Sequence, residues 1–495
     1  VIARTSVMQY KGTTKTIGEI GEELGVDYIL EGTVRWQKTS SGTDRVRVTP
    51  QLIKVSDGTH AWADIYDEDL AEVFTVQTDI AMSITKALGI ALLEPEKAAL
   101  IDAPTSSVEA YDYFLRGNQY WWKSGVGHSE RELTLAYSSY REAIEIDPRF
   151  VAAYARMART KTELYWHTTF DSTDLIEAYG ILQKALLLDS NSVESRVALA
   201  SYYYHDYEYE KALVELDRAI AIHPNNSDAL IEYSYVLARQ GNFNEAIEYT
   251  RKASALDPQS APIVYILGWL LVLSRQFDEA EIYLSKALRL EPDKAQYYVM
   301  MAQLLVARDG DLTKARRALK DSESLIVFDE DFNRLSFKLA LWDEDLDAAY
   351  KYAEYASQRA AVSLLRGDTA LAQAQLDSAY AETIELIEDH PGQNYEASLP
   401  IVLSRMGRCE EAVGVGISSI ESAQVWMDQF WVRESLAYAY MHCGDNDSAF
   451  EVLETLLSSP GFTTPTRVRI NPLWDPLRDD PRYGPLLQKY EGFTL

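Results

Sequence analysis

Small, aromatic and proline residues return at a fixed step of 34 positions through the middle of this chain. The recurring set is Ala212, Ala219 and Pro224, then Ala246, Ala253 and Pro258, then Ala280, Ala287 and Pro292. Further small residues keep the same step at Ala200, Ser234, Gly268 and Ala302, and aromatic residues keep it at Tyr209, Phe243 and Phe277. A period of this length is typical of stacked pairs of antiparallel helices. The small residues are expected where two helix axes approach most closely. The aromatic residue then fills the wedge near the turn, and the proline ends the second helix.

The pattern resembles the tetratricopeptide (TPR) family. Three units, 193–226, 227–260 and 261–294, follow one another without a gap. The unit before them, 151–192, is 42 residues long instead of 34, and we expect its insertion at "WHTTFDST" between the two helices. An earlier unit ends at "REAIEIDP", and a unit from 295 to about 329 has a slipped register.

Beyond residue 330 the marks weaken. Second helices are predicted at 345–356, 370–379 and 407–419, and a clearer unit follows at 431–460. We expect about nine helix-hairpin units in a solenoid over 109–460. The tail "NPLWDPLRDDPRYGPLL" then predicts a C-terminal cap over 461–495 that covers the last pair with Trp474, Leu477 and Tyr483.

The resemblance implies a binding groove on the concave face, which is lined by the first helix of each pair. The family's geometry assigns to this groove Tyr204, His205, Tyr235, Arg239, Tyr265, Trp269, Leu273 and Gln303. Aromatic residues with one arginine would suit an extended or helical peptide. The alternative is that these rings pack within the superhelix. The family's clamp for a terminal carboxylate needs lysine and asparagine at positions that hold other residues here, so a chaperone-tail adaptor is not expected.

Residues 1–97 lack the repeat and predict a small α+β domain. "VIARTS" is expected as a short strand, and 16–25 as a helix that ends at Gly25. Three strands are expected in "VDYILEGTVRW", "RVRVTPQLIKV" and "HAWADIYD", with turns at "SSGTD" and "SDGT". A closing amphipathic helix follows, and then a linker over 98–108 that contains "IDAPTSS".

These strings together are similar to the TolB-like amino-terminal domain, which in its family commonly precedes TPR arrays in bacterial signalling proteins. Such proteins often carry an adenylate or guanylate cyclase, a Ser/Thr kinase or a winged-helix domain further upstream. The family's domain normally begins with another strand and helix before "VIARTS", so we expect that domain to be truncated here.

Charge narrows the range of partners. The chain has 76 Asp and Glu against 47 Lys and Arg, a formal net charge of −29. A field of this sign repels phosphate backbones and anionic lipid, so no nucleic acid is expected to bind this region. The acidic surface serves solubility or, alternatively, attracts basic peptides. The longest apolar run, 263–273, is shorter than the ~20 residues that span a bilayer.

No catalytic motif is found. The sequence contains no H-E-x-x-H, no phosphate-binding P-loop and no G-x-S-x-G, so we expect no enzyme activity, no cofactor and no metal in this chain. Cys409 and Cys443 both fall near predicted turns. One bridge between them is possible, but two unpaired thiols are expected. With His442 they would form only an incomplete zinc ligand set.

The sequence therefore predicts a mainly α fold, a TPR solenoid preceded by a small α+β domain. The leading functional interpretation is a non-enzymatic scaffold of a bacterial signalling protein that binds a protein or peptide, with basic or aromatic ligands favoured. One alternative is the regulatory part of a cyclase, a kinase or a winged-helix regulator whose output domain is encoded upstream. Another is an array that binds a small ligand or a cell-wall fragment between hairpins. Partner identity and oligomeric state stay open. So does the compartment, which in the family is either the cytoplasm or the periplasm behind a transmembrane helix encoded upstream.

Overall fold

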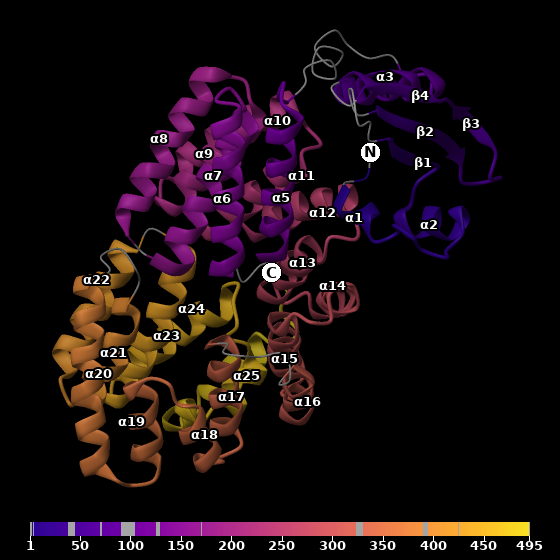
Figure 1. Cartoon of the computed structure of the whole chain (residues 1–495). Coiled ribbons are helices and arrows are strands. Elements are labelled where there is room, and N and C mark those ends of the chain that lie inside the picture. The colour runs from indigo at the N-terminus through magenta and orange to yellow at the C-terminus, as the bar shows by residue number, and fades with distance from the viewer. Residues whose placement is uncertain are drawn as a thin grey trace. The chain divides into compact units, whose positions relative to one another are not determined.

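The fold is taken from a computed structural model of the chain (Figure 1). It describes residues 2, 4–37, 45–69, 72–90, 104–124, 129–169, 171–322, 330–389, 395–423 and 425–494. These residues form two compact units. The first comprises Val1–Ala229 with Leu256–Gln259, and the second comprises Leu230–Ala255 with Ser260–Leu495.

The first unit begins with a small antiparallel sheet and three helices. They are α1 (Arg4–Met8), α2 (Ile17–Leu24), β1 (Tyr28–Gln37), β2 (Arg45–Lys54), β3 (His60–Ala63), β4 (Tyr66–Asp69) and α3 (Val73–Ala87). Strand β2 pairs with β1 along one edge and with β3 and β4 along the other. Helix α3 packs against β2, β3 and β4, where Val46 and Leu52 of β2 are buried (Figure 1). The predicted turn at 40–44 and residues 98–103 of the predicted linker lie outside the described residues.

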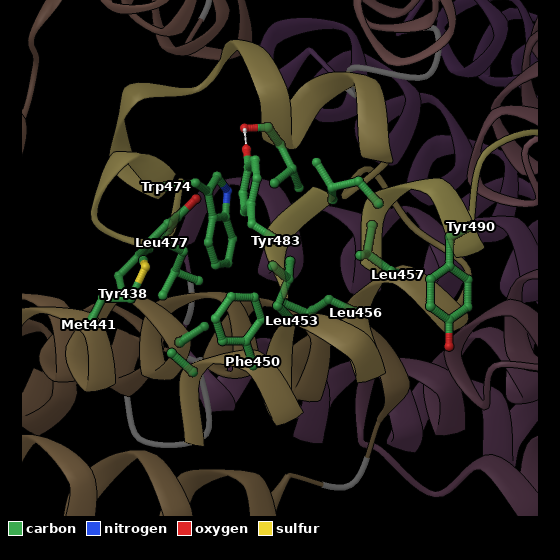
Figure 2. Close-up of a cluster of buried hydrophobic side chains, with 14 of the residues drawn as sticks. Tyr438, Met441, Phe450, Leu453, Leu456, Leu457, Trp474, Leu477, Tyr483 and Tyr490 are labelled. Carbon is green, nitrogen blue, oxygen red and sulfur yellow. Dashed lines mark hydrogen bonds between the residues drawn. The ribbon is translucent and has the colours of Figure 1, made fainter. Parts of the chain in front are cut away.

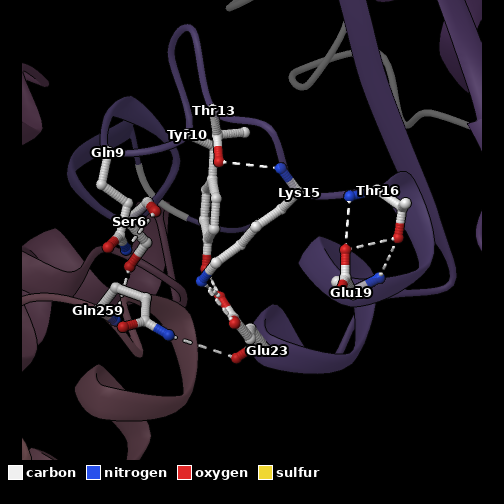
Figure 3. Close-up of polar contacts among 9 residues, drawn as sticks. All are labelled: Ser6, Gln9, Tyr10, Thr13, Lys15, Thr16, Glu19, Glu23 and Gln259. Carbon is white, nitrogen blue, oxygen red and sulfur yellow. Dashed lines mark hydrogen bonds and ion pairs between the residues drawn. The ribbon is translucent and has the colours of Figure 1, made fainter.

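Helix α2 forms where the sequence predicts it, because both of its ends carry local signals. At its start the Thr16 side chain accepts from the backbone N–H of Glu19, and the Glu19 carboxylate accepts from the backbone N–H of Thr16 at 2.7 Å (Figure 3). This capping box satisfies two amides that the helix itself cannot use. At its end Gly25 adopts a φ of +65°, the left-handed conformation that terminates helices.

Two predictions for this region are wrong. "VIARTS" was expected as a strand, but Arg4–Met8 forms a helical turn. A strand needs a neighbour that bonds its backbone, and no described strand pairs with these residues. Ser6 instead accepts a hydrogen bond from the backbone N–H of Gln259 at 2.8 Å, within the same unit (Figure 3).

"HAWADIYD" was expected as one strand and is split into β3 and β4. Its two halves pair with β2 on either side of Pro50. Because proline has no N–H to donate, the ladder is interrupted opposite that residue. Only the Pro50 carbonyl is used on this edge, as acceptor for the backbone N–H of Asp64 at 3.2 Å.

From residue 108 onward the described chain is an array of helix pairs. The pairs that begin in the first unit are α5 (Val108–Ser124) with α6 (Glu130–Ile146), α7 (Val151–Leu164) with α8 (Ser172–Leu188), and α9 (Val193–His205) with α10 (Tyr209–Ile222). The predicted insertion lies between α7 and α8, where η2 (Tyr165–Thr169) is a π-helical turn. The division between the two units falls inside α11 (Ser227–Arg239).

The second unit continues the array. Helix α11 pairs with α12 (Phe243–Leu256), α13 (Ala261–Leu273) with α14 (Phe277–Leu290), and α15 (Ala295–Asp309) with α16 (Leu312–Ser322). The later pairs are α17 (Glu330–Trp342) with α18 (Leu346–Tyr352), α19 (Ala356–Leu365) with α20 (Thr369–Asp389), α21 (Leu399–Arg405) with α22 (Cys409–Ser422), and α23 (Trp426–His442) with α24 (Asn446–Ser458). The described residues therefore hold ten pairs, one more than the nine expected.

The three gapless units begin at the predicted residues, since α9, α11 and α13 start at 193, 227 and 261. Their recurring alanines are fully buried at positions 212, 219, 246, 253, 280 and 287. Gly268 shows why small residues recur at these helix crossings. A Cβ atom placed there would lie 2.7 Å from Cδ2 of Leu284 on the partner helix. The small residues are therefore required by close helix packing.

The hairpin turns keep the same step. Tyr207, Gly241 and Arg275 each have a positive φ, at 34-residue intervals, and the next such residue is Gly310, one position later than the step requires. This extra residue is the slipped register expected for the unit that starts at 295. A left-handed residue between the two helices of a pair thus recurs with the same step.

The C-terminal segment packs against the last helix pair. It contains α25 (Pro465–Ile470), η5 (Pro472–Leu477) and α26 (Tyr483–Lys489). Trp474, Leu477 and Tyr483 are buried against Phe450 and Leu453 of α24 (Figure 2). This apolar cluster covers the face of α24 that would otherwise meet water.

The same segment also contacts α13 and α15, which no sequence signal predicted. The backbone N–H of Gly461 donates to the carbonyl of Leu273 at 2.8 Å, and the Thr464 hydroxyl donates to the carbonyl of Ala307 at 2.8 Å. Buried Arg275 donates to the carbonyls of Leu456, Leu457, Ser459 and Thr463 at 2.6–3.4 Å. The segment therefore closes the second unit at the C-terminal ends of α13 and α15, and its Phe462 and Arg467 line one cavity with residues of these two helices.

The expectation of two free thiols is also wrong. Cys409, the first residue of α22, and Cys443, which follows α23, form a disulfide with their Cα atoms 5.7 Å apart. The two ends of these helices meet because the cysteines occupy nearby turns of consecutive pairs. The disulfide removes both thiolates that the zinc hypothesis required.

Candidate functional site

A cavity of about 700 Å³ lies within the second unit. Its wall is formed by Tyr265 and Trp269 of α13, by Met300, Gln303 and Val306 of α15, by Asp331, Arg334, Leu335, Lys338 and Trp342 of α17, by Ala397, Ser398 and Ile401, by Met427, Asp428, Trp431, Glu434, Ser435 and Tyr438 of α23, and by Phe462 and Arg467. Cavities of this size commonly hold a small molecule or a few side chains of a partner.

Helical spacing explains why these side chains share the cavity. Trp431, Ser435 and Tyr438 recur every three or four residues along α23, so they lie on one face of that helix. The lining residues of α13, α15 and α17 follow the same spacing. All four helices are the first members of their pairs, and the closing segment adds Phe462 and Arg467.

The wall is rich in aromatic rings. Trp431 stacks on Phe462 with ring centroids 6.3 Å apart, and Tyr265 stacks on Tyr297 at 4.9 Å. Trp269 and Trp431 are partly buried, and Trp342 is buried. Aromatic side chains contribute large apolar areas at binding sites and lose little entropy on binding.

Two cations lie against these rings. The Lys338 ammonium is 5.6 Å from the centroid of the Trp431 ring, and the Arg467 guanidinium is 5.4 Å from that of Trp342. Arg467 also donates to the carbonyl of Phe462 at 3.2 Å. Each contact is a cation–π interaction, which orients the cation and leaves most of its N–H donors unused.

The carboxylates of the cavity are engaged elsewhere. Asp331 forms an ion pair with Arg334, and Glu434 accepts a hydrogen bond from the Thr463 hydroxyl at 3.1 Å. Neither Lys338 nor Arg467 lies within 4 Å of a carboxylate of any described residue. Burial and repulsion from Arg467 lower the pKa of Lys338 to about 7.

The structure distributes the predicted groove residues over different environments. Tyr265, Trp269 and Gln303 line the cavity. Leu273 on α13 is fully buried, so its side chain is not accessible to a ligand. Tyr235 and Arg239 on α11 are partly buried and are not part of the cavity wall.

Tyr204 and His205 belong to the first unit and are separate from the cavity wall. His205 is buried, and its Nδ1 atom lies 2.8 Å from the carbonyl of Ser201. Its ring also packs against Trp166, with centroids 5.2 Å apart. These contacts give His205 a packing role within the first unit.

Sequence reasoning missed the lining residues of α17, α23 and the closing segment. Trp342 lies on the first helix of a weakly marked repeat, and Trp431 opens the clearer unit at 431–460. The size of these two side chains was the one signal that could have suggested them. Phe462 and Arg467 carried no signal, because only the closure of the second unit brings them to the cavity.

Within the ranges given above, no group of three or more His, Cys, Asp or Glu side chains could hold a metal ion. Among the same residues, no helix has the length and apolar character needed to cross a bilayer.

Comparison with known proteins identifies the repeat. Residues 203–270 and 237–304 match the family model of the tetratricopeptide repeat. The helix pairs of this chain thus form a TPR solenoid, which a small α+β region precedes.

One curated relative is the "putative adenylate cyclase 3" of Rhizobium meliloti (strain 1021), 32% identical over 203 residues. The match covers 40% of this chain and 33% of the relative, so the chain spans about a third of that protein. Similar solved structures include pilF of Pseudomonas aeruginosa, at 21% identity and a TM-score of 0.34, covering 50% of this chain and 96% of that one. Another is a thermophilic TPR protein of Thermus thermophilus, at 19% identity and a TM-score of 0.34, covering 40% and 99%.

Proposed function

We propose that this chain is a non-enzymatic interaction region of a bacterial signalling protein, and that the cavity of the second unit binds a segment of a partner protein. The observation that carries the proposal is the cavity itself, with Trp269, Trp342 and Trp431 in its wall. The TPR match supports it, because the inner helices of such arrays form binding surfaces.

The cavity includes three of the predicted groove residues and adds residues from other elements to them. Tyr265, Trp269 and Gln303 contribute one part of its wall, and α23 with the closing segment contributes another. A partner segment would therefore be enclosed from several directions instead of lying on an open surface. Enclosure of this kind concentrates binding energy in a few aromatic contacts.

A random peptide library displayed on phage and selected on the full chain tests this proposal. Enriched peptides are then titrated by fluorescence anisotropy against the wild type and the Trp269→Ala and Trp431→Ala variants. We expect each variant to weaken binding about tenfold or more, as for interface hot spots. The matched control is Trp36→Ala, which removes a 61% exposed tryptophan from β1, far from the cavity in sequence.

Circular dichroism and thermal unfolding establish that the variants are folded. Peptides that bind the two cavity variants as tightly as the wild type would show that the cavity is not the site. Equal weakening by Trp36→Ala would show that tryptophan contacts elsewhere dominate.

A second candidate is favoured by the relative's name, that of an adenylate cyclase. On this hypothesis residues 1–97 are a TolB-like domain, and the chain regulates a cyclase, kinase or winged-helix output domain encoded upstream. Sequencing the gene upstream of the codon for Val1 decides between these output domains. The Cys409–Cys443 disulfide favours an oxidising compartment such as the periplasm for the array.

A further inference from the structure

Lys338 and Arg467 come from distant parts of the sequence and meet at one cavity. Lys338 lies on α17, and Arg467 lies on α25 in the closing segment. The chain has 29 more acidic than basic residues (76 against 47), so carboxylates are abundant. Even so, no carboxylate of a described residue lies within 4 Å of either cation.

The donors of these cations are largely unused. An ammonium group has three N–H donors and a guanidinium has five. Among the described residues, the one hydrogen bond from these two groups is that of Arg467 to the carbonyl of Phe462. Partly buried charges are stabilised when an opposite charge completes their hydrogen bonds.

The carboxylates that face Lys338, those of Asp331 and Glu434, attract its ammonium from beyond ion-pair distance, and each has a closer partner. On α17, Asp331 is paired with Arg334. On α23, Glu434 is hydrogen-bonded to Thr463, and Asp428 has other contacts. These carboxylates offset only part of the repulsion between Lys338 and Arg467, and a carboxylate bound at contact distance would offset more of it.

We infer that the cavity anchors its ligand through a carboxylate bound between Lys338 and Arg467, with an attached aromatic or apolar group packed against Trp269, Trp342 and Trp431. The inference rests on the proposed function, since it names the chemistry of the segment that enters the same cavity. A carboxylate matches the planar donor pair of arginine and the point charge of lysine. The tryptophan wall supplies a matching surface for a ring.

The overall negative charge opposes this ligand only at long range. At physiological ionic strength the Debye length is about 8 Å, so distant surface carboxylates are screened. The two cations act at contact distance in a partly desolvated cavity, where charge pairs are stronger than in water. Lys338 and Arg467 should thus determine the sign of the charge that the cavity binds.

Titration of full-length protein with two matched small probes tests the carboxylate directly. The probes are 3-phenylpropionate and its neutral analogue 3-phenylpropanamide, followed by ligand-observed NMR. We expect the carboxylate to bind about tenfold or more tightly than the amide, the effect of one charge-assisted hydrogen bond. A selected peptide, compared with its amidated or Asn/Gln-substituted form, distinguishes a peptide carboxylate from a free organic acid.

Variants locate the anchor. Lys338→Met and Arg467→Gln should each weaken the carboxylate probe about tenfold, with little effect on the amide. The control Lys252→Met removes a cation that lies 5.0 Å from the Tyr249 ring outside the cavity wall, and it should change neither affinity. Thermal unfolding checks that each variant is folded.

The pH profile gives an independent readout. Lys338, whose pKa is lowered to about 7, faces Asp331 and Arg334 on its own helix, Glu434 and Asp428 on α23, and Arg467 on α25. It is charged below its pKa, so affinity for the carboxylate should fall from about pH 6 to about pH 9 as Lys338 loses its proton. The same profile should be flat in Lys338→Met.

Each outcome separates the inference from the proposed function. Equal binding of carboxylate and amide forms, or unchanged binding in Lys338→Met, overturns the carboxylate anchor. If neutral peptides still bind and Trp269→Ala still weakens them, the cavity remains the partner site without this anchor. If no probe and no selected peptide binds, both proposals are wrong.

Discussion

At the scale of single residues, close packing of the paired helices depends on small side chains at the positions where the helices cross. Gly268 lies where α13 and α14 cross, and a Cβ atom there would meet both Cδ2 and Cγ of Leu284, at 2.7 and 2.8 Å. The alanines of the neighbouring units occupy fully buried positions of the same kind. A well-packed interface of this kind tolerates an added methyl group poorly.

Gly268→Ala should therefore lower the free energy of unfolding by about 1–3 kcal/mol, in spite of alanine's better helix propensity. Gly180→Ala in α8 is the matched control. It is also a helical glycine, but nothing lies within 4 Å of its added Cβ, so it should stabilise by up to about 1 kcal/mol. Chemical denaturation measures both changes. A stabilising Gly268→Ala would show that the helices do not approach as closely as the structure places them.

The repeat positions were predictable because local packing imposes them, but the accessibility of the groove residues was not. The family's offsets place Leu273 and Gln303 on the inner face, and both are on inner helices. Leu273 is buried where the closing segment passes, since its carbonyl accepts the N–H of Gly461. That contact spans almost two hundred residues, and no periodic pattern encodes it.

At the scale of helices and turns, the weak repeats hold much of the candidate site. Sequence marks located the second helices α18, α20 and α22 but not α17, which contributes Lys338 and Trp342 to the cavity. The second helices keep small residues such as Ala349 and Ala412, both fully buried. The first helix α17 instead carries several residues that line the cavity. The repeat pattern is therefore weakest where the helix contributes to the candidate site.

The disulfide joins the turn of a weakly marked pair, α21 with α22, to the turn of the clearer last pair, α23 with α24. It closes a loop of 34 residues, so the chain-entropy model predicts a contribution of about 3–4 kcal/mol to stability. Replacing both Cys409 and Cys443 by alanine should lower the free energy of unfolding by this amount. Urea denaturation with and without reductant measures it.

The double variant also provides the control for the reductant. Dithiothreitol should destabilise the wild type and leave the double variant unchanged. Two thiols that react in the native, unreduced protein would contradict the disulfide and restore the free-thiol expectation.

At the scale of the second unit, the closing segment changes what the array can bind. An open solenoid has an exposed inner face, whereas here Gly461 and Thr464 bond to α13 and α15. The segment was predicted only as a cap for the last helix pair, because its apolar residues indicated burial but not where its backbone would bond. The closing segment therefore has two roles that can be tested separately. It covers α24, and it closes the cavity.

Gly461→Ala tests the second role in the intact chain. Gly461 has a φ of +134°, and a Cβ atom there would lie 2.5 Å from Cε2 of Phe430, so alanine is both strained and crowded. We expect about 2 kcal/mol of destabilisation and faster amide exchange in α13 and α15 as well as in α23 and α24. Hydrogen–deuterium exchange followed by mass spectrometry resolves these helices.

Gly484→Ala in α26 provides the control from the same segment, since nothing lies within 4 Å of its added Cβ. It should leave exchange unchanged throughout the second unit. If Gly461→Ala accelerated exchange in α23 and α24 alone, the segment would act only as a cap. In that case the segment would not close the cavity in solution, and Arg467 would not be part of the cavity wall. Because the carboxylate anchor needs Arg467 there, Gly461→Ala should also weaken 3-phenylpropionate binding when closure is real.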